Sequence, residues 1–230
     1  MRRITKQKEP PTLTEYRQGT PHPTWDGYAD KRSAQAALYE EQKSICCFCQ
    51  RRIVPDEQPT DRALVRNMKI AHFVPRKSAA GQKSPALEVT WNNLFGVCMG
   101  GEASEPGKQS LPADEQHCDT KQGNAELYPE LNPLVLKPGI VKFRRSGVVY
   151  SDNQAVDADL NQKLNLNARA PKAGRLAARD ALIQLIEANK PGHWSAATIL
   201  RRIDEIERQV PLSPYCDFLL FILKERLRAS

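Results

Sequence analysis

Residues 44–50 read Ser-Ile-Cys-Cys-Phe-Cys-Gln, and this short stretch decides how the rest of the chain is interpreted. Cys46 and Cys49 form a C-x-x-C pair, whose two thiolates can hold one zinc ion from a tight turn. Zinc needs two more ligands, and Cys98 and Cys118 lie in polar, loop-like sequence that suits this role. We therefore predict a structural zinc site made of these four cysteines, the alternative being that the later two are buried, inert thiols.

The remaining cysteines and one histidine have to be weighed against this set. Cys47 adjoins Cys46, so its side chain should leave the turn in another direction, and Cys216 lies in an apolar helix. Both are expected to be core residues. His117 could replace a zinc cysteine, although the neighbouring Cys118 has the better spacing.

The composition is that of a globular protein with a basic surface. Of 230 residues, 40% are hydrophobic and 27% are charged, which argues against wholesale disorder. The net charge of +7 fits a polyanionic partner such as nucleic acid, and it is also compatible with a surface that is merely basic. The chain shows neither an apolar run of about 18 residues nor the apolar segment of a signal peptide, so we expect a cytoplasmic protein with no membrane partner.

Three regions follow from the residue pattern, which predicts an α+β protein. An amino-terminal arm and helix cover residues 1–44, the zinc domain covers 45–124, and a hairpin with a mainly helical carboxy-terminal region covers 125–230. The arm is rich in Pro and Thr and should be extended, docking through its aromatic side chains. Helical spacing of alanine and leucine then predicts a helix at 29–44.

Short strands and loops are expected in the middle of the chain. The pattern predicts strands at 44–48 and 68–74, and a long loop at 99–116 that is rich in Gly and Pro. Two β-prone runs, 140–143 and 148–150, flank a Ser-Gly pair and predict a hairpin.

Helices are expected in the last third of the chain. One should begin near Pro171, a second should be capped by Ser195, and a third should follow Pro214. The second helix has an apolar stripe made of Ile199, Ile203, Ile206 and Val210. On the first helix, Lys172, Arg175 and Arg179 share one face, which is either a phosphate-tracking stripe or an ordinary solvated surface.

Further motifs lie between the two halves of the cysteine pattern. The stretch 70–75 reads Ile-Ala-His-Phe-Val-Pro, Trp91-Asn92-Asn93-Leu94 leads to Cys98, and Asp119-Thr120-Lys121 follows Cys118. Taken in this order, the motifs resemble those of HNH endonucleases with a zinc-stapled ββα-metal core. The resemblance covers about a third of the chain.

A narrower resemblance rests on the surrounding sequence. It is carried by the basic arm, by Glu41-Gln42 before the Cys46–Cys49 turn (the knuckle), and by Leu131-Asn132-Pro133-Leu134 and Leu164-Asn165-Leu166-Asn167. These features are similar to PtuB, the HNH subunit of Septu-type and retron-linked antiphage defence systems. The resemblance implies that the chain works with an ABC-type ATPase subunit, PtuA-like, in such a complex.

The HNH resemblance implies a role for each motif in phosphodiester hydrolysis. His72 would be the general base, and Asn93, which directly precedes Leu94 and is therefore preferred to Asn92, would orient the imidazole. Asp119 would be a ligand of a catalytic Mg²⁺ or Mn²⁺ ion. The residues expected to contact nucleic acid are Arg76, Lys77 and Lys121.

One position departs from the HNH pattern. The residue before the base is often a metal ligand, but here it is Ala71, whose methyl group cannot bind a metal. Asp119, waters and substrate alone could then hold the ion, or His117, Glu88 or Asp114 could substitute, or the site could have lost activity. We therefore predict a metal-dependent HNH endonuclease subunit, the alternative being a catalytically impaired zinc module that binds nucleic acid or a partner protein.

Overall fold

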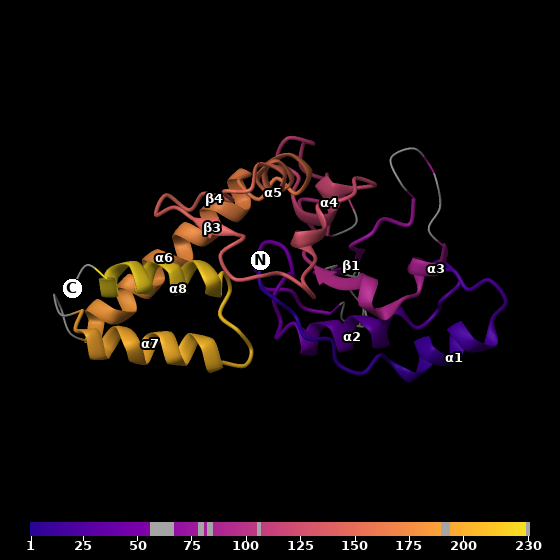
Figure 1. The fold of residues 1–230 in the computed structure, drawn as a ribbon, viewed down its shortest axis with the longest axis horizontal. Helices are drawn as coiled ribbons and strands as arrows, with labels where there is room; N and C mark the ends of the chain where they lie inside the picture. Colours follow the sequence, from indigo (N-terminus) through magenta and orange to yellow (C-terminus); the bar gives the residue numbers. More distant parts are fainter. Residues whose placement is uncertain (56–66, 78–80, 82–84, 105–106, 190–193, 229–230) are drawn as a thin grey trace.

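The computed structural model covers the whole chain, and it describes residues 1–55, 67–77, 81, 85–104, 107–189 and 194–228. Helices predominate, and the named strands within these ranges form two small antiparallel sheets, so the predicted α+β class is confirmed. The helices α6, α7 and α8 gather at one end of the molecule, and α1, α2 and α3 lie at the other (Figure 1).

The elements have the following bounds. The helices are α1 (Pro11–Gly19), α2 (Lys31–Glu41), α3 (Pro85–Glu88), α4 (Cys118–Gln122), α5 (Gln154–Ala158), α6 (Arg169–Asn189), α7 (Ala196–Arg208) and α8 (Cys216–Arg228). The strands are β1 (Lys69–His72), β2 (Leu94–Val97), β3 (Lys142–Phe143) and β4 (Val149–Tyr150). The short 3₁₀ and π turns are η1 (Trp91–Asn93), η2 (Pro129–Leu131) and η3 (Asp159–Lys163).

The amino-terminal arm is not extended throughout, as the sequence had suggested, because residues Pro11–Gly19 form α1. A proline at the first position of this helix suits the fixed φ of that residue. The arm docks through its aromatic side chains, since Trp25 and Tyr28 are both buried.

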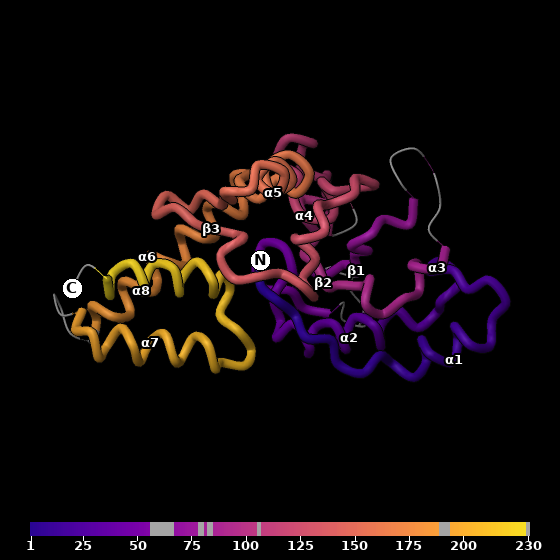
Figure 2. Tube along the Cα trace, viewed as in Figure 1, coloured from indigo at the N-terminus to yellow at the C-terminus, as the bar shows by residue number. Residues whose placement is uncertain are grey.

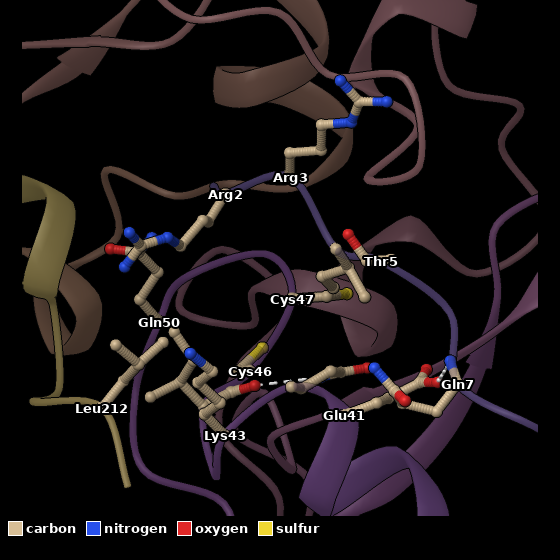
Figure 3. Close-up of a pocket in the computed structure, with 13 residues that line it drawn as sticks. Arg2, Arg3, Thr5, Gln7, Glu41, Lys43, Cys46, Cys47, Gln50 and Leu212 are labelled. Atoms are coloured by element: carbon tan, nitrogen blue, oxygen red, sulfur yellow. Dashed lines mark hydrogen bonds between the residues drawn. The ribbon is translucent and has the colours of Figure 1, made fainter. Parts of the chain in front are cut away.

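An internal ion pair fixes the start of the arm to the core. The Lys6 ammonium lies 2.7 Å from a Glu41 carboxylate whose side chain is fully buried, and it also lies over the Trp91 ring. The other Glu41 oxygen accepts a hydrogen bond from the Gln7 backbone N–H (Figure 3). A buried charge pair of this kind is costly to break on one side, so we expect the arm to stay docked.

The hairpin β1–β2 lies beside α2, as the Cα trace shows (Figure 2). Its register pairs Lys69 with Val97 and His72 with Leu94. The predicted strand at 44–48 is wrong, because only an isolated bridge from Ile45 to Arg52 forms there. This segment is instead a tight turn, which suits a C-x-x-C knuckle better than a strand does.

The carboxy-terminal helices match the expected pattern with two corrections. Ser195 caps α7 by accepting a hydrogen bond from the Thr198 N–H, as predicted. Val210, however, lies beyond the end of α7 and is 68% exposed, so it is not part of the buried stripe. Arg175 is buried and donates to the backbone oxygens of Gly147 and Leu166, so it cannot belong to a phosphate-tracking face.

Two buried clusters make up the core. One runs from the arm through the cysteine region to Leu166, and the other joins α6, α7 and α8 with Ile45. Among the described residues, no helix is long and apolar enough to cross a membrane. The division of the chain at residues 44 and 124 stays a prediction.

Candidate active site

The four cysteines of the predicted zinc site converge in the structure. The sulfurs of Cys46, Cys49, Cys98 and Cys118 all lie within 4.8 Å of one another, and all four residues are buried. The Cys46–Cys118 sulfurs are 3.9 Å apart and the Cys49–Cys98 sulfurs are 3.7 Å apart. These separations are far longer than the roughly 2.05 Å of a disulfide bond.

The sulfur separations also test whether zinc would fit. A tetrahedral ion with Zn–S bonds of about 2.3 Å requires its sulfurs to lie about 3.8 Å apart. The two measured pairs fall on either side of this value. Burial raises the pKa of Cys118 well above that of a free thiol, and the neighbouring cysteines reinforce the shift. A bound cation would favour the thiolates, so the donor set fits a structural zinc ion.

The knuckle is positioned by a glutamine that links it to the hairpin. The Gln42 amide donates to the carbonyls of Ile45 and Gly96 and accepts a hydrogen bond from the Gly96 N–H. An added Cβ at Gly96 would lie 2.6 Å from the terminal methyl group of Met68 and 3.1 Å from that of Ile53, so these side chains would have to move. The backbone of β2 can therefore come close to the knuckle, which brings Cys98 to the other sulfurs.

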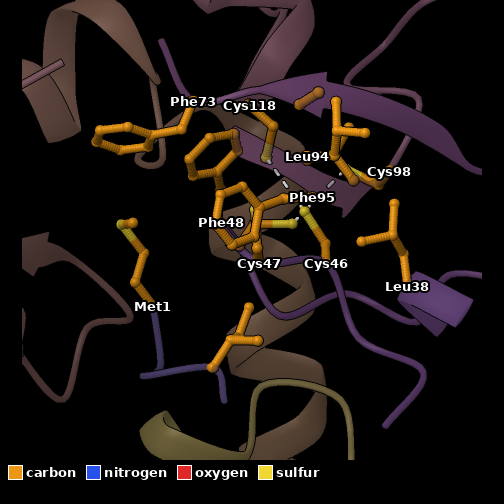
Figure 4. Packing of buried hydrophobic residues seen from close by; sticks show 14 of the residues in the cluster. Met1, Leu38, Cys46, Cys47, Phe48, Phe73, Leu94, Phe95, Cys98 and Cys118 are labelled. Atoms are coloured by element: carbon orange, nitrogen blue, oxygen red, sulfur yellow. Dashed lines mark hydrogen bonds between the residues drawn. The ribbon is translucent and has the colours of Figure 1, made fainter. Parts of the chain in front are cut away.

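An aromatic shell surrounds the sulfurs. Phe48, Phe73 and Phe95 are buried near the cluster (Figure 4). Cys47 is buried, but its sulfur is not part of the converging group, and Cys216 is buried at the start of α8. Nε2 of His117 lies 3.9 Å from the Cys98 sulfur, but among the described residues the ligand atoms that all lie within 4.8 Å of one another are the four cysteine sulfurs, which are therefore the better ligand set.

A cleft of about 400 Å³ lies on the other side of β1 and α4. The side chains that carry chemistry in it are those of Lys69, His72, Arg76, Glu102 and Asp119. Asp119 directly follows the zinc-site residue Cys118 in α4, and His72 ends the strand that pairs with β2. The cysteine cluster and the cleft therefore share the same short elements.

His72 is held as a neutral imidazole that faces the cleft. Its Nε2 donates to the Glu88 carbonyl at 2.9 Å, which leaves Nδ1 without a proton in the neutral ring. The Trp25 ring meets the imidazole edge-on at 5.3 Å between centroids. Burial lowers the pKa of His72, and the nearby Arg76 charge acts in the same direction. An unprotonated nitrogen in a cleft is what a general base requires.

The amino-terminal arm takes part in this arrangement, which the sequence did not reveal. The Glu88 carboxylate accepts a hydrogen bond from the Trp25 backbone N–H, while the Glu88 carbonyl accepts from His72. Asp26 forms an ion pair with Arg76 at 2.7 Å. The arm thus supports both the imidazole and the guanidinium.

The HNH resemblance implies that Asn93 orients the imidazole. In the structure, however, the hydrogen bonds of the Asn93 side chain go to backbone groups and not to His72. Its side-chain oxygen accepts from the Val74 N–H at 2.8 Å, and its amide donates to the carbonyls of Val74 and Leu87. Its buried side chain therefore fixes the turn that follows His72, and the orientation of the ring comes from Glu88.

Lys69 and Glu102, which the sequence did not single out, also line the cleft and contact each other. The Lys69 ammonium lies 2.9 Å from the Asp119 carboxylate and 2.6 Å from the Glu102 carboxylate. It also donates to the Thr120 hydroxyl at 3.2 Å. Burial opposes the lysine charge, but the two carboxylates outweigh it and raise the pKa of Lys69. Glu102 lies within the 99–116 loop, whose sequence gives no sign of where it folds.

The donor set of the cleft fits a divalent cation. Two carboxylates already converge on one positive charge, and oxygen is the ligand type that Mg²⁺ and Mn²⁺ prefer. Ala71 is buried within β1 and offers no donor atom. Of the substitutes considered from the sequence, His117 lies beside the cysteines, and neither Glu88 nor Asp114 is among the residues that line the cleft.

The three basic residues expected to touch nucleic acid are not placed alike. Arg76 lines the cleft, whereas Lys77 is exposed outside its lining. Lys121 donates to the Ala113 carbonyl at 2.9 Å and is also absent from the lining. Of these three residues, Arg76 alone lines the cleft that holds His72 and Asp119.

Comparison with known proteins gives one match to report, and no family model matches the chain. The chain is 28% identical over 141 residues to the "Retron Ec83 putative HNH endonuclease" of Escherichia coli. The match covers 57% of this chain, and the chain spans about half the length of that curated relative. This similarity supports a relationship of the chain to the HNH endonuclease family.

Proposed function

We propose that this chain is an HNH endonuclease subunit that hydrolyses phosphodiester bonds of nucleic acid with the help of a divalent ion. The observation that carries the proposal is the meeting of His72 and Asp119 in one cleft, beside four converging cysteines. The similarity to a protein named as a retron HNH endonuclease supports the same conclusion. In this proposal the hairpin β1–β2 and α4 form the ββα-metal core.

The residues of the cleft have distinct roles in this proposal. Nδ1 of His72 accepts the proton of the attacking water, because Nε2 is committed to the Glu88 carbonyl. Arg76 contacts an oxygen of the scissile phosphate and neutralises part of its charge. Asp119 and Glu102 hold the Mg²⁺ or Mn²⁺ ion, which when bound stabilises the charge on the phosphate and on the leaving oxygen.

The proposed setting is an antiphage defence complex with an ABC-type ATPase, PtuA-like. The name of the relative supports a retron-linked setting. The ATPase partner rests on the resemblance of the surrounding sequence to PtuB described above. Either DNA or RNA would fit as the substrate, because the cleft residues are proposed to contact phosphates, which both nucleic acids carry. The second candidate function, a catalytically impaired zinc module, is favoured by one observation, which is the missing donor at Ala71.

A cleavage assay tests the proposal. The chain would be purified alone and with a co-expressed ATPase, and incubated with plasmid DNA, single-stranded DNA and tRNA in Mg²⁺ or Mn²⁺. We expect cleavage that EDTA stops and that His72→Ala reduces by about 10²–10⁴-fold, the usual contribution of a general base. His22→Asn, at an exposed histidine with a positive φ, should cut like the parent.

Two results would count against the nuclease. Equal cleavage by the parent and His72→Ala would show that the base is misassigned. A parent that is inert on every substrate, with zinc bound and the ATPase present, would favour the zinc-module function instead.

A further inference from the structure

Lys69 occupies the place in the cleft where a divalent ion would be expected. Its ammonium contacts carboxylate oxygens of Glu102 and Asp119 and the hydroxyl of Thr120. No other carboxylate is among the described residues that line the cleft. The same two carboxylates therefore serve the lysine when no divalent ion is bound.

A lysine and a divalent ion compete for these carboxylates. Two positive charges a few ångströms apart repel each other by several kcal/mol at the effective dielectric of a partly exposed site, roughly 4 kcal/mol for unit charges at 4 Å. Lysine has a long, flexible stem, so the ammonium can move without displacing β1. Its side chain is 25% exposed, which leaves it an open path toward a bound substrate.

We propose that Lys69 is an exchangeable cation, which holds Asp119 and Glu102 in the resting protein and moves to a phosphate oxygen of bound nucleic acid. The departure of the ammonium leaves both carboxylates free for the divalent ion. This inference rests on the proposed function, because it takes nucleic acid as the ligand that attracts Lys69.

The mechanism predicts a thermodynamic coupling between the two ligands. Nucleic acid removes the competing cation and so raises the affinity for the ion, and the ion raises the affinity for nucleic acid by the same factor. A protein without a cation at position 69 would bind the ion well even in the absence of nucleic acid.

Binding of Mn²⁺ to the full-length, zinc-loaded chain tests this proposal without any cleavage. Free Mn²⁺ would be followed by electron paramagnetic resonance for the parent, for Lys69→Met and for the control Lys8→Met. We expect Lys69→Met to bind Mn²⁺ at least about tenfold more tightly than the parent, in line with the repulsion between close charges. The control should bind like the parent, because Lys8 is exposed and is not among the residues that line the cleft.

Two further measurements make the result unambiguous. Asp119→Asn, added to Lys69→Met, should abolish the gain, which locates the ion at the carboxylates. A 20-nucleotide oligomer should tighten Mn²⁺ binding to His72→Ala protein but not to the Lys69→Met, His72→Ala protein. If Lys69→Met loses zinc or fold, Lys69→Gln removes the same charge with a polar side chain.

Unchanged or weaker Mn²⁺ binding by the folded Lys69 variant would overturn the proposal and leave Lys69 as a purely structural ion pair. A chain that shows the expected Mn²⁺ response but cuts nothing would instead refute the proposed nuclease activity. The two failures are therefore distinguishable.

Discussion

The cysteine cluster and the His72 cleft are neighbours of opposite character. The cluster is closed, because its four sulfurs are buried and together supply every ligand that a tetrahedral zinc ion takes. The cleft is open, its donors are two carboxylates, and a lysine already occupies them. A closed ligand set is typical of structural metal sites, whereas a site with free positions is typical of catalytic ones. The contrast favours a structural role for the cluster and, in the proposed function, a catalytic role for the cleft.

The two regions depend on each other through very short connections. Cys118 and Asp119 are consecutive, and Cys98 directly follows the strand that pairs with His72. A change in the cluster should therefore disturb both stability and activity, whereas a change in the cleft should disturb activity alone. The predictions for Cys118 and for the pH profile test the two sides of that asymmetry, and a third, for Asn93, tests the turn that follows His72.

The largest effect is expected from the cluster. Cys118→Ala should lose the zinc ion and with it much of the cooperative fold, because structural zinc contributes on the order of 10 kcal/mol to folding. Metal content by mass spectrometry and thermal unfolding by circular dichroism would measure this. Cys47→Ala is the matched control, since it removes a buried thiol next to the cluster and should keep one zinc per chain. A Cys118→Ala protein with zinc and a parental melting temperature would contradict the assignment.

A smaller effect is expected at the turn that follows His72. Asn93→Ala removes three hydrogen bonds in a buried position and should lower the free energy of unfolding by about 1–3 kcal/mol. Cleavage should fall as well, because Val74 would no longer be fixed, and zinc should be retained. Asn92→Ala, at an exposed neighbour, should change neither quantity. If the two variants behave alike, Asn93 is not the residue that holds the turn.

The smallest effect is a shift in the pH profile of cleavage. His72 acts as a base only when neutral, and burial lowers its pKa, so the neutral form persists below pH 6.5. The acidic limb of kcat/KM should therefore have its midpoint below 6.5, and activity should be lost as the pH falls through it. Removing the nearby charge with Arg76→Gln should move this limb to higher pH. An acidic limb above 6.5 in the parent would be inconsistent with a buried imidazole base.

The sequence predicted those features that depend on the spacing of nearby residues. The cysteine set could be chosen because zinc requires four ligands in a tight geometry, and Ser195 could be chosen because helix capping is a local rule. The helix α1 was missed because the many prolines around it favour an extended arm. The basic face of α6 was ambiguous for a different reason. Arg175 is buried by tertiary packing, which no local sequence feature shows.

The centre of the cleft could not be read from the sequence. Glu102 lies 2.6 Å from Lys69, which precedes it by 33 residues, and a Gly-rich segment gives no local signal for such a contact. The support of His72 by Trp25 and Glu88 joins residues that are far apart in the chain. Motif order pointed to His72 and Asp119, to which the proposed function gives catalytic roles, whereas the partners of these residues depend on tertiary packing.

The most direct test of this account is X-ray absorption at the zinc edge of the purified chain. We predict one zinc per chain with four sulfur neighbours at about 2.3 Å and no nitrogen neighbour, because the cysteine sulfurs converge while His117 remains outside. A protein that contains no zinc, or a spectrum with fewer sulfurs and a histidine ligand, would contradict it.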